Sequence, residues 1–198
     1  MDEETTQAFE EARPGVARIF RQAGVLREGH FVLTSGLHSG LYWEKFRILQ
    51  YPEYTGQLCA LFADHFAHRG PTVVVGPTTG GIILSYETAR RLCIRGVFAE
   101  KEGDRRMLRR DFAISPGERV LIVDDILTTG KSVFETIEAV RALDGNIIGI
   151  GVLVDRSEGG INFGAELFSC LKAPTTAYAP DECPLCAAGV PLTRPGGA

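Results

Sequence analysis

Residues 120–132 read VLIVDDILTTGKS, an aliphatic run followed by two acids and a small polar turn. Four consecutive aliphatic residues are typical of a strand that is buried on both faces of a sheet. Asp124 and Asp125 follow them directly, and two neighbouring carboxylates repel each other unless a cation or a hydroxyl group engages them. The stretch therefore predicts a strand–turn–helix junction that binds a ligand.

Three interpretations of this junction compete. Gly130-Lys131-Ser132 matches the end of a nucleotide-triphosphate loop, but Asp125 occupies the position of that loop's first glycine, where a carboxylate would repel the phosphates. A purely structural role is the second interpretation, because Asp and Thr are good helix caps. In the third, the amides of residues 128–132 bind a phosphate monoester and the two carboxylates accept hydrogen bonds from a ribose diol. A ribose 5-phosphate group offers both partners, which favours the third interpretation.

The chain around the junction predicts an α/β fold. From residue 72 onward, short β-branched runs such as TVVV, RVLIV and NIIGIGVLV alternate with segments of helical period, including residues 131–143. Continuous apolar strands joined by helices indicate a mostly parallel central sheet flanked by helices. Ligands bind beyond the carboxyl ends of such strands, where both the acid pair and residues 76–81 (GPTTGG) are expected.

The N-terminal part predicts a smaller appendage. One amphipathic helix is expected over about 4–24, with Gly24 as its stop, followed by two short strands within 30–49 that a Ser-Gly loop separates. A further helix should begin at Pro52 and end at Gly70. We expect a single domain of residues 1–198, with a helix and small hood over about 1–50, a core sheet over about 70–170 and an extended C-terminal segment over 175–198.

Composition excludes some classes of protein. The 198 residues are 44% hydrophobic and 23% charged, with a formal net charge of −4, as in an ordinary globular domain. This mild acidity argues against a nucleic-acid or membrane-surface partner. No apolar run approaches the roughly 18–20 residues that a membrane-spanning helix needs, and the acidic N-terminus is unlike a signal peptide. We expect a cytoplasmic protein.

Five cysteines are present, an odd number that argues against a disulfide framework. Cys183 and Cys186 have the spacing of half a zinc site, but a structural zinc site needs four ligands. No second C-x-x-C or H-x-x-x-H follows them along the chain. A plain C-terminal turn is therefore the favoured interpretation, and no metal-ligating residue is predicted.

The whole of residues 120–132 resembles the 5-phosphoribosyl 1-diphosphate (PRPP) motif of type I phosphoribosyltransferases. Other segments resemble the orotate phosphoribosyltransferases within that family: FVLTSGLHSGLY (31–42) their N-terminal hood, GPTTGGI (76–82) their pyrophosphate loop, and VDR (154–156) their orotate-contacting strand end. CPLCAAGVPL (183–192) resembles the ending of one bacterial branch. The resemblance covers most of residues 20–192.

The resemblance implies which residues form the site. Thr128 and Arg156 would contact orotate, whose carboxylate an Arg reads through two parallel hydrogen bonds. For Arg156 an ion pair beside Glu158 is the structural alternative. Lys101, Asp124 and Asp125 would be catalytic. The residues expected to bind PRPP are Asp124, Asp125, Ile126, Leu127, Thr128, Thr129, Gly130, Lys131, Ser132, Thr79, Gly80, Lys101 and Arg105.

Residues 100–111 (EKEGDRRMLRRD) resemble the mobile basic loop that, in the family, closes over the diphosphate and excludes water. Lys101 and either Arg105 or Arg106 are the expected contacts, and a solvated charged hairpin is the alternative. The segment departs from the family pattern because it is short and contains no His. Thr34 is a second departure, since many relatives have Lys there.

The activity implied is displacement at the anomeric carbon of PRPP. A ring nitrogen of orotate attacks, pyrophosphate leaves, and orotidine 5′-monophosphate forms for pyrimidine synthesis. The resemblance also implies Mg²⁺ bound mainly through the diphosphate, and a homodimer. Two alternatives stay open at this point: a transferase for a purine or another base, and a regulator that senses PRPP without catalysing a reaction.

Overall fold

The computed structural model describes residues 3–33, 35–157, 159–173 and 176–195. Its helices are α1 (Glu3–Glu11), α2 (Pro14–Ala23), α3 (Phe46–Leu49), α4 (Pro52–Phe66), the 3₁₀ turn η1 (Ala67–Arg69), α5 (Gly80–Leu92), α6 (Lys131–Arg141) and α7 (Pro184–Ala187). Its strands are β1 (Leu26–Val32), β2 (His38–Trp43), β3 (Val73–Pro77), β4 (Arg95–Glu102), β5 (Arg105–Leu108), β6 (Arg119–Leu127), β7 (Asn146–Asp155) and β8 (Leu167–Lys172). In the described ranges, every helix is too short or too polar to cross a membrane.

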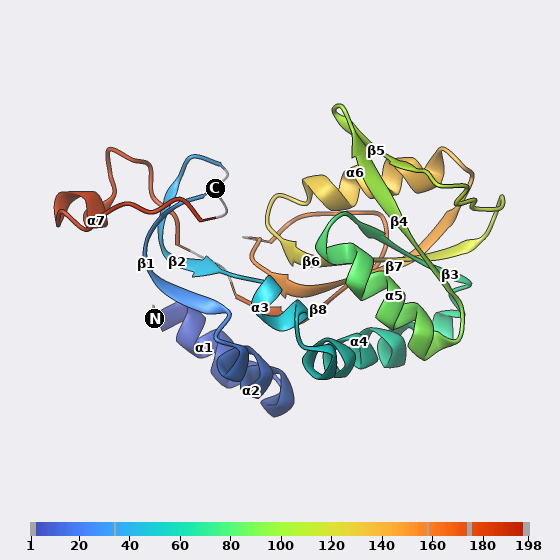
Figure 1. Ribbon diagram of the computed structural model, residues 1–198, viewed down its shortest axis with the longest axis horizontal. Helices are drawn as coiled ribbons and strands as arrows, with labels where there is room; N and C mark the ends of the chain where they lie inside the picture. Colours follow the sequence, from blue (N-terminus) through green and yellow to red (C-terminus); the bar gives the residue numbers. More distant parts are fainter. Residues whose placement is uncertain (1–2, 34, 158, 174–175, 196–198) are drawn as a thin grey trace.

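The central sheet has six strands in the order β5-β4-β3-β6-β7-β8. All its neighbouring pairs are parallel except β4 with β5, which form an antiparallel hairpin. Helices α4 and α5 lie on one side of this sheet and α6 lies on the other (Figure 1). The predicted fold class, a mostly parallel central sheet flanked by helices, is confirmed.

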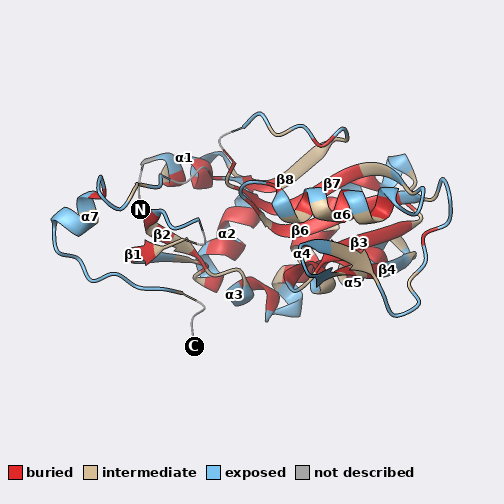
Figure 2. Ribbon diagram, turned by 90° about the horizontal axis from the view of Figure 1, so that it is seen from above, coloured by how far each residue is buried: buried red, intermediate tan, exposed pale blue. Residues whose placement is uncertain are grey.

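Burial on both faces explains the continuous aliphatic run before the acid pair. Successive side chains of a strand point to opposite faces. Leu121 and Val123 belong to the buried cluster that includes Phe62 of α4, whereas Ile122 belongs to the cluster that includes Ile137 of α6. Helix α6 is buried on the side that faces the sheet and exposed on its outer side (Figure 2).

The N-terminal helix differs from the prediction. The expected single helix over about 4–24 is two helices, because Pro14 is the first residue of α2 and the residue before a proline is pushed out of the helical region. Gly24 does end α2, with a left-handed backbone at φ +61°. The helix expected to begin at Pro52 is confirmed as α4, which is followed by η1 and capped by Gly70.

The acid pair lies within its strand rather than after it. Ile126 and Leu127 still pair with Val154 and Asp155 of β7, so β6 continues for two residues beyond the acids. The carboxyl end of the sheet therefore brings the acid pair and the end of β7 together. This pairing fixes the relative positions of the two segments in which site residues were predicted.

Strands β1 and β2 form a separate antiparallel pair, which we call the hood. The C-terminal segment, residues 176–195, lies along the hood. Tyr178 exchanges two backbone hydrogen bonds of 2.8 Å with His38, and Thr193 bridges to Phe31. Figure 1 shows α7, β1 and β2 gathered at the end of the molecule away from β4 and β5.

Candidate active site

Asp124 and Asp125 occupy opposite faces of β6, and each has its own partner. Asp124 Oδ2 accepts a hydrogen bond of 2.6 Å from the hydroxyl of Ser132, at the start of α6. Its Oδ1 accepts one of 2.8 Å from the backbone N–H of Asp125. Asp125 Oδ1 accepts the N–H of Ile126 at 2.7 Å. Both acids are about 5% exposed or less, so these partners replace water.

The two acids cannot easily carry full charge together. Burial, and then the charge of Asp125, raise the pKa of Asp124 to about 7, against the opposing effect of the Ser132 hydrogen bond. Asp124 therefore keeps its proton to a higher pH than an ordinary aspartate does. A ligand that brings hydroxyl donors would stabilise its charged form, because hydrogen bonds to a carboxylate lower its pKa.

Lys45 neutralises the second acid, a contact that no sequence pattern predicts. Its ammonium lies 3.0 Å from both carboxylate oxygens of Asp125. Lys45 comes from the turn between β2 and α3, so the contact joins residues 80 positions apart. A single Lys in a mixed-composition stretch gives no sequence signal for such a contact, because only the fold brings the hood up to the sheet.

The loop after β3 touches the acid pair through a glycine. A Cβ atom on Gly80 would lie 2.0 Å from Asp125 Oδ2, so a side chain at this position would displace the carboxylate. Thr79 is exposed beside it, and the backbone N–H of Thr78 donates to the Ala99 carbonyl at 3.0 Å. The structure thus brings the predicted residues Thr79 and Gly80 next to Asp125.

The turn before α6 is open to an anion. Gly130 caps the helix with φ +78°, and Thr128 and Thr129 are exposed. Among the described residues, no backbone N–H of residues 128–132 has a hydrogen-bond acceptor, as expected at the first turn of a helix. Lys131 is exposed and its ammonium lies 3.9 Å from Glu135. The open amides fit a phosphate group better than the Lys131 side chain does.

Of the remaining residues predicted in this motif, Leu127 is buried in the core, while Ile126 is half-buried. Their side chains hold the strand in the sheet. Any contact that Leu127 makes with a ligand must come from its backbone, because its side chain is buried.

Arg156 follows β7 and lies beside the same end of β6. Its backbone N–H donates to the Leu127 carbonyl at 2.8 Å. Burial lowers the pKa of its guanidinium to about 10, and Tyr42 of the hood raises it in part. An Arg held in a half-buried position beside a tyrosine can receive a planar anion. Glu158, its proposed ion-pair partner, lies outside the described residues, as does Thr34.

The hairpin of β4 and β5 separates the predicted basic residues. Lys101 and Arg105 are exposed, and within the described parts of the chain their side chains have no ion-pair or hydrogen-bond partner. Arg106, the predicted alternative to Arg105, points inward instead. Its guanidinium donates to the Thr78 hydroxyl at 3.1 Å and carbonyl at 3.3 Å, and lies 3.3 Å from Glu135 without an aligned hydrogen bond. Arg106 therefore positions the loop after β3.

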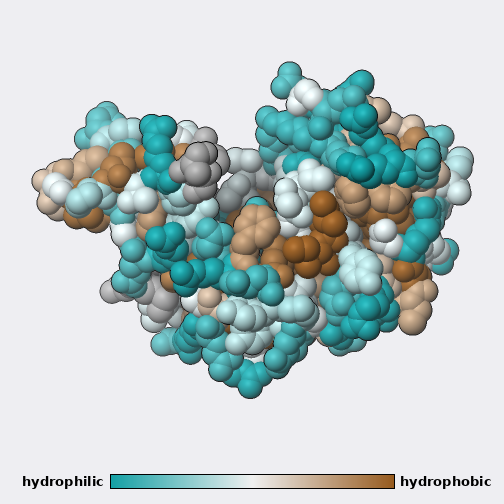
Figure 3. Space-filling view, viewed as in Figure 1, coloured by the Kyte–Doolittle hydropathy of each residue, from teal (hydrophilic) through white to brown (hydrophobic). Residues whose placement is uncertain are grey.

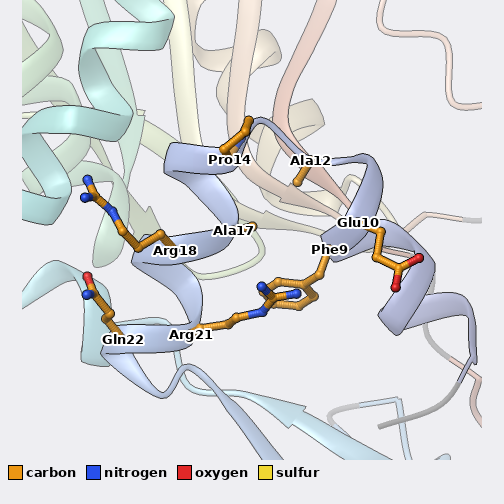
Figure 4. Close-up of a pocket in the computed structure, with 8 residues that line it drawn as sticks. All are labelled: Phe9, Glu10, Ala12, Pro14, Ala17, Arg18, Arg21 and Gln22. Atoms are coloured by element: carbon orange, nitrogen blue, oxygen red, sulfur yellow. The ribbon is translucent and has the colours of Figure 1, made fainter.

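A hollow on the N-terminal helices lies apart from this site. It has a volume of about 590 Å³ and lies between α1 and α2, lined in part by Phe9, Arg18 and Arg21, with Arg21 over the Phe9 ring (Figure 4). None of the candidate active-site residues lines this hollow. The space-filling view shows the surface indented between the hood end of the molecule and the β4–β5 end (Figure 3).

The sequence and the fold both match known proteins. Residues 48–185 match the model of the phosphoribosyl transferase domain. The chain belongs to the phosphoribosyltransferase family. The expected family and transferase class are thereby confirmed.

Individual relatives refine the match. The protein is 49% identical over 184 residues to a protein of Pelotomaculum thermopropionicum named orotate phosphoribosyltransferase, covering 93% of this chain and 97% of the relative. The crystal structure of orotate phosphoribosyltransferase from Aeropyrum pernix is similar with a TM-score of 0.69 at 27% identity, over 79% of this chain and 93% of that one. Adenine phosphoribosyltransferase from Saccharomyces cerevisiae shares the fold, with a TM-score of 0.62 at 21% identity, over 78% of this chain and 99% of that one.

The raised pKa of Asp124 makes a prediction about stability. Its carboxyl holds its proton more tightly in the folded than in the unfolded state, so the contribution of Asp124 to folding stability should fall as pH rises from about 4 to about 7. Asp124→Asn removes this loss while keeping a partner for Ser132. The ligand-free variant should therefore be more stable than the wild type above pH 7, by on the order of a few kcal/mol, with the difference vanishing near pH 4.

Urea denaturation of both proteins across this pH range measures the difference. Asp64→Asn, at an exposed position of α4, is the matched control and should show no such pH dependence. A constant offset between Asp124→Asn and the wild type at every pH would contradict the assignment.

Proposed function

We propose that this protein transfers the 5-phosphoribosyl group of PRPP to orotate, giving orotidine 5′-monophosphate and pyrophosphate. The observation that carries the proposal is the acid pair near the end of β6 together with the turn that follows it. Among the described residues, the backbone N–H groups of residues 128–132 in this turn have no hydrogen-bond acceptor. Relatives that are 46–49% identical over 91% or more of this chain are named orotate phosphoribosyltransferase, which supports the same activity.

The two halves of the junction would bind different parts of one ligand. The amides of residues 128–132 and the start of α6 favour a phosphate monoester, since both the N–H groups and the helix dipole attract negative charge. Asp124 and Asp125 accept hydrogen bonds from the 2- and 3-hydroxyl groups of the ribose. The sugar is thereby oriented by both of its ends, and its anomeric carbon is directed toward the remaining site residues.

The base would be selected at the end of β7. The adenine phosphoribosyltransferase neighbours share the fold, so the fold alone does not choose the base. Arg156 offers a guanidinium beside the ribose site, and orotate differs from the other pyrimidines and purines in carrying a carboxylate that Arg can bind through two hydrogen bonds. Thr128, exposed one residue after β6, is the second proposed contact.

The chemistry needs positioning rather than a covalent nucleophile. A ring nitrogen of orotate forms a bond to the anomeric carbon while the bond from that carbon to the diphosphate oxygen breaks. Negative charge builds on the departing pyrophosphate, where nearby cations stabilise it. Lys101 and Arg105, exposed on the β4–β5 hairpin, are the proposed cations, and Arg106 holds the Thr78–Thr79 loop against which the diphosphate would lie.

The donor atoms at the site fit Mg²⁺ held mainly by substrate. Asp124 and Asp125 supply hard carboxylate oxygens, but Ser132 and Lys45 already engage them. A magnesium ion usually keeps several waters and binds through one or two carboxylates together with substrate phosphates. Bound in this way, it would neutralise charge on the diphosphate.

We also propose a homodimer, in which the β4–β5 hairpin reaches toward a second subunit. Lys101 and Arg105, which are exposed and have no side-chain partner among the described residues, support this arrangement. Sedimentation velocity should give the mass of two chains, and a monomer at micromolar concentration would refute the proposed dimer.

Cytoplasmic localisation stays a prediction.

A base panel tests the activity directly. The protein with Mg²⁺ and PRPP is given orotate, uracil, adenine, guanine or xanthine separately, and pyrophosphate release is measured. We expect release with orotate alone, abolished by EDTA. Release with adenine but not orotate would refute the proposal, and PRPP binding without release for any base would favour a regulatory protein.

Arg156→Ala tests the base site. Loss of paired hydrogen bonds to a carboxylate should raise the orotate KM by roughly 10–100-fold, with the PRPP KM changed less than about threefold. Arg156→Lys keeps the charge but not the paired geometry and should recover only part of the loss. Arg18→Ala, in the hollow between α1 and α2, is the control and should leave both constants unchanged. Equal rises in both KM values for Arg156→Ala would show that this Arg is misassigned.

A further inference from the structure

Four side chains with metal-binding atoms converge at the hood, far along the chain from the acid pair. They are His30 of β1, His38 of β2, and Cys183 and Cys186 of the C-terminal segment. One ligand atom from each lies within 4.8 Å of all the others. Both cysteines are free thiols. We propose that these four residues bind a structural Zn²⁺ ion.

The spacing of the ligand atoms carries the proposal. Zinc binds imidazole nitrogen at about 2.0–2.1 Å and thiolate sulfur at about 2.3 Å, so a tetrahedral site has N···N edges of about 3.3 Å and N···S edges of about 3.6 Å. His30 Nε2 and His38 Nδ1 are 3.2 Å apart. The Cys186 sulfur lies 3.3 Å from His38 Nδ1 and 3.7 Å from His30 Nε2, and the Cys183 sulfur lies 3.5 Å from His30 Nε2. Four measured edges therefore agree with one tetrahedron.

The protonation of His30 suits a metal ligand. Its Nδ1 lies 2.8 Å from the Val190 carbonyl, which can only accept a hydrogen bond. In the neutral ring the proton therefore sits on Nδ1, and Nε2 directs its lone pair into the cluster. A carbonyl that accepts the other ring N–H is the usual outer partner of a zinc-bound histidine, because it fixes the tautomer and the orientation of the ring.

Burial and ligand number indicate a structural rather than a catalytic ion. His30, His38 and Cys183 are 2%, 6% and 3% exposed, and four protein ligands complete the coordination. Cys186 is exposed at α7, which gives the ion a route to the site. With no coordination position left for water, the ion would hold chain segments together.

The segments that it would join are the two hood strands and the C-terminal segment. Among the described residues, the backbone of the C-terminal segment is hydrogen-bonded to the hood at two places, through Tyr178 to His38 and through Thr193 to His30 and Val32. The hood in turn carries Tyr42, and Lys45 follows it toward the acid pair. Zinc binding would therefore stabilise the part of the protein that reaches the active site from the N-terminal side.

The sequence predicts no metal ligand, because neither a second C-x-x-C nor an H-x-x-x-H follows Cys186 along the chain. His38 precedes Cys186 by 148 residues, and the two histidines are eight residues apart. Neither spacing belongs to a familiar zinc motif. Only the antiparallel pairing of β1 with β2, and the return of the C-terminal segment to that pair, brings the four residues together.

Metal content is the direct test. The full-length protein, purified without chelator and dialysed against metal-free buffer, should contain about one zinc per chain by plasma mass spectrometry. After removal of zinc under reducing conditions, Co²⁺ should bind and give the visible bands of tetrahedral cobalt together with a thiolate-to-cobalt charge-transfer band. Less than about 0.1 zinc per chain, combined with no such cobalt spectrum, would overturn the proposal, as would a disulfide between Cys183 and Cys186 that persists in reducing buffer.

Variants assign the ligands. Cys186→Ser and His38→Gln should each lower zinc content at least tenfold after dialysis and change the cobalt spectrum. Cys93→Ser alters an exposed thiol outside the cluster and should keep one zinc per chain. If Cys183→Ser fails to fold, Cys186→Ser decides, because its side chain is exposed. Full zinc retention and an unchanged cobalt spectrum in Cys186→Ser would refute the site.

Discussion

Two adjacent carboxylates buried at the end of a central strand are the constraint on which the rest of the structure depends. Taking one carboxylate out of water is costly, and taking two costs more unless each is compensated. Here a hydroxyl engages Asp124 and an ammonium engages Asp125. Those two partners come from different directions, the start of α6 and the turn after β2. The local electrostatics of β6 thus require both the helix that follows it and the hood.

This requirement explains how distant parts of the chain converge on one site. Gly80 is needed where the loop after β3 meets Asp125, since any side chain would displace the carboxylate. Lys45 is held there by the hood, and the hood is backed by the C-terminal segment through backbone pairing and the four metal-binding side chains. The basic hairpin contributes Arg106 to the same loop from the opposite edge. The loop after β3 and the hood therefore contact the acid pair, while the hairpin and the C-terminal segment position them.

The sequence predicted the parts of the fold and of the site that local patterns encode. Strands β3, β6 and β7 and helices α4 and α6 follow from aliphatic runs and helical spacing, and the acid pair with its turn is one contiguous motif. The break at Pro14 was missed, because the apolar spacing continues across it although proline ends the first helix. Lys45 and the histidines of the metal cluster were missed because their partners lie 80 and about 150 residues away. The inward turn of Arg106 depends on the β4–β5 pairing register, which its charge pattern does not reveal.

In the proposed complex the acids bind the ribose hydroxyls while the turn binds the phosphate. Calorimetric titration of the protein with ribose 5-phosphate and with 2-deoxyribose 5-phosphate separates the two contributions, because the ligands share the phosphate and differ by one hydroxyl. A hydrogen bond to a charged acceptor contributes about 1.5–3 kcal/mol, so ribose 5-phosphate should bind roughly 10–100 times more tightly. Equal affinity for the two ligands would mean that the carboxylates do not contact the 2-hydroxyl group, and would contradict the proposed ribose site.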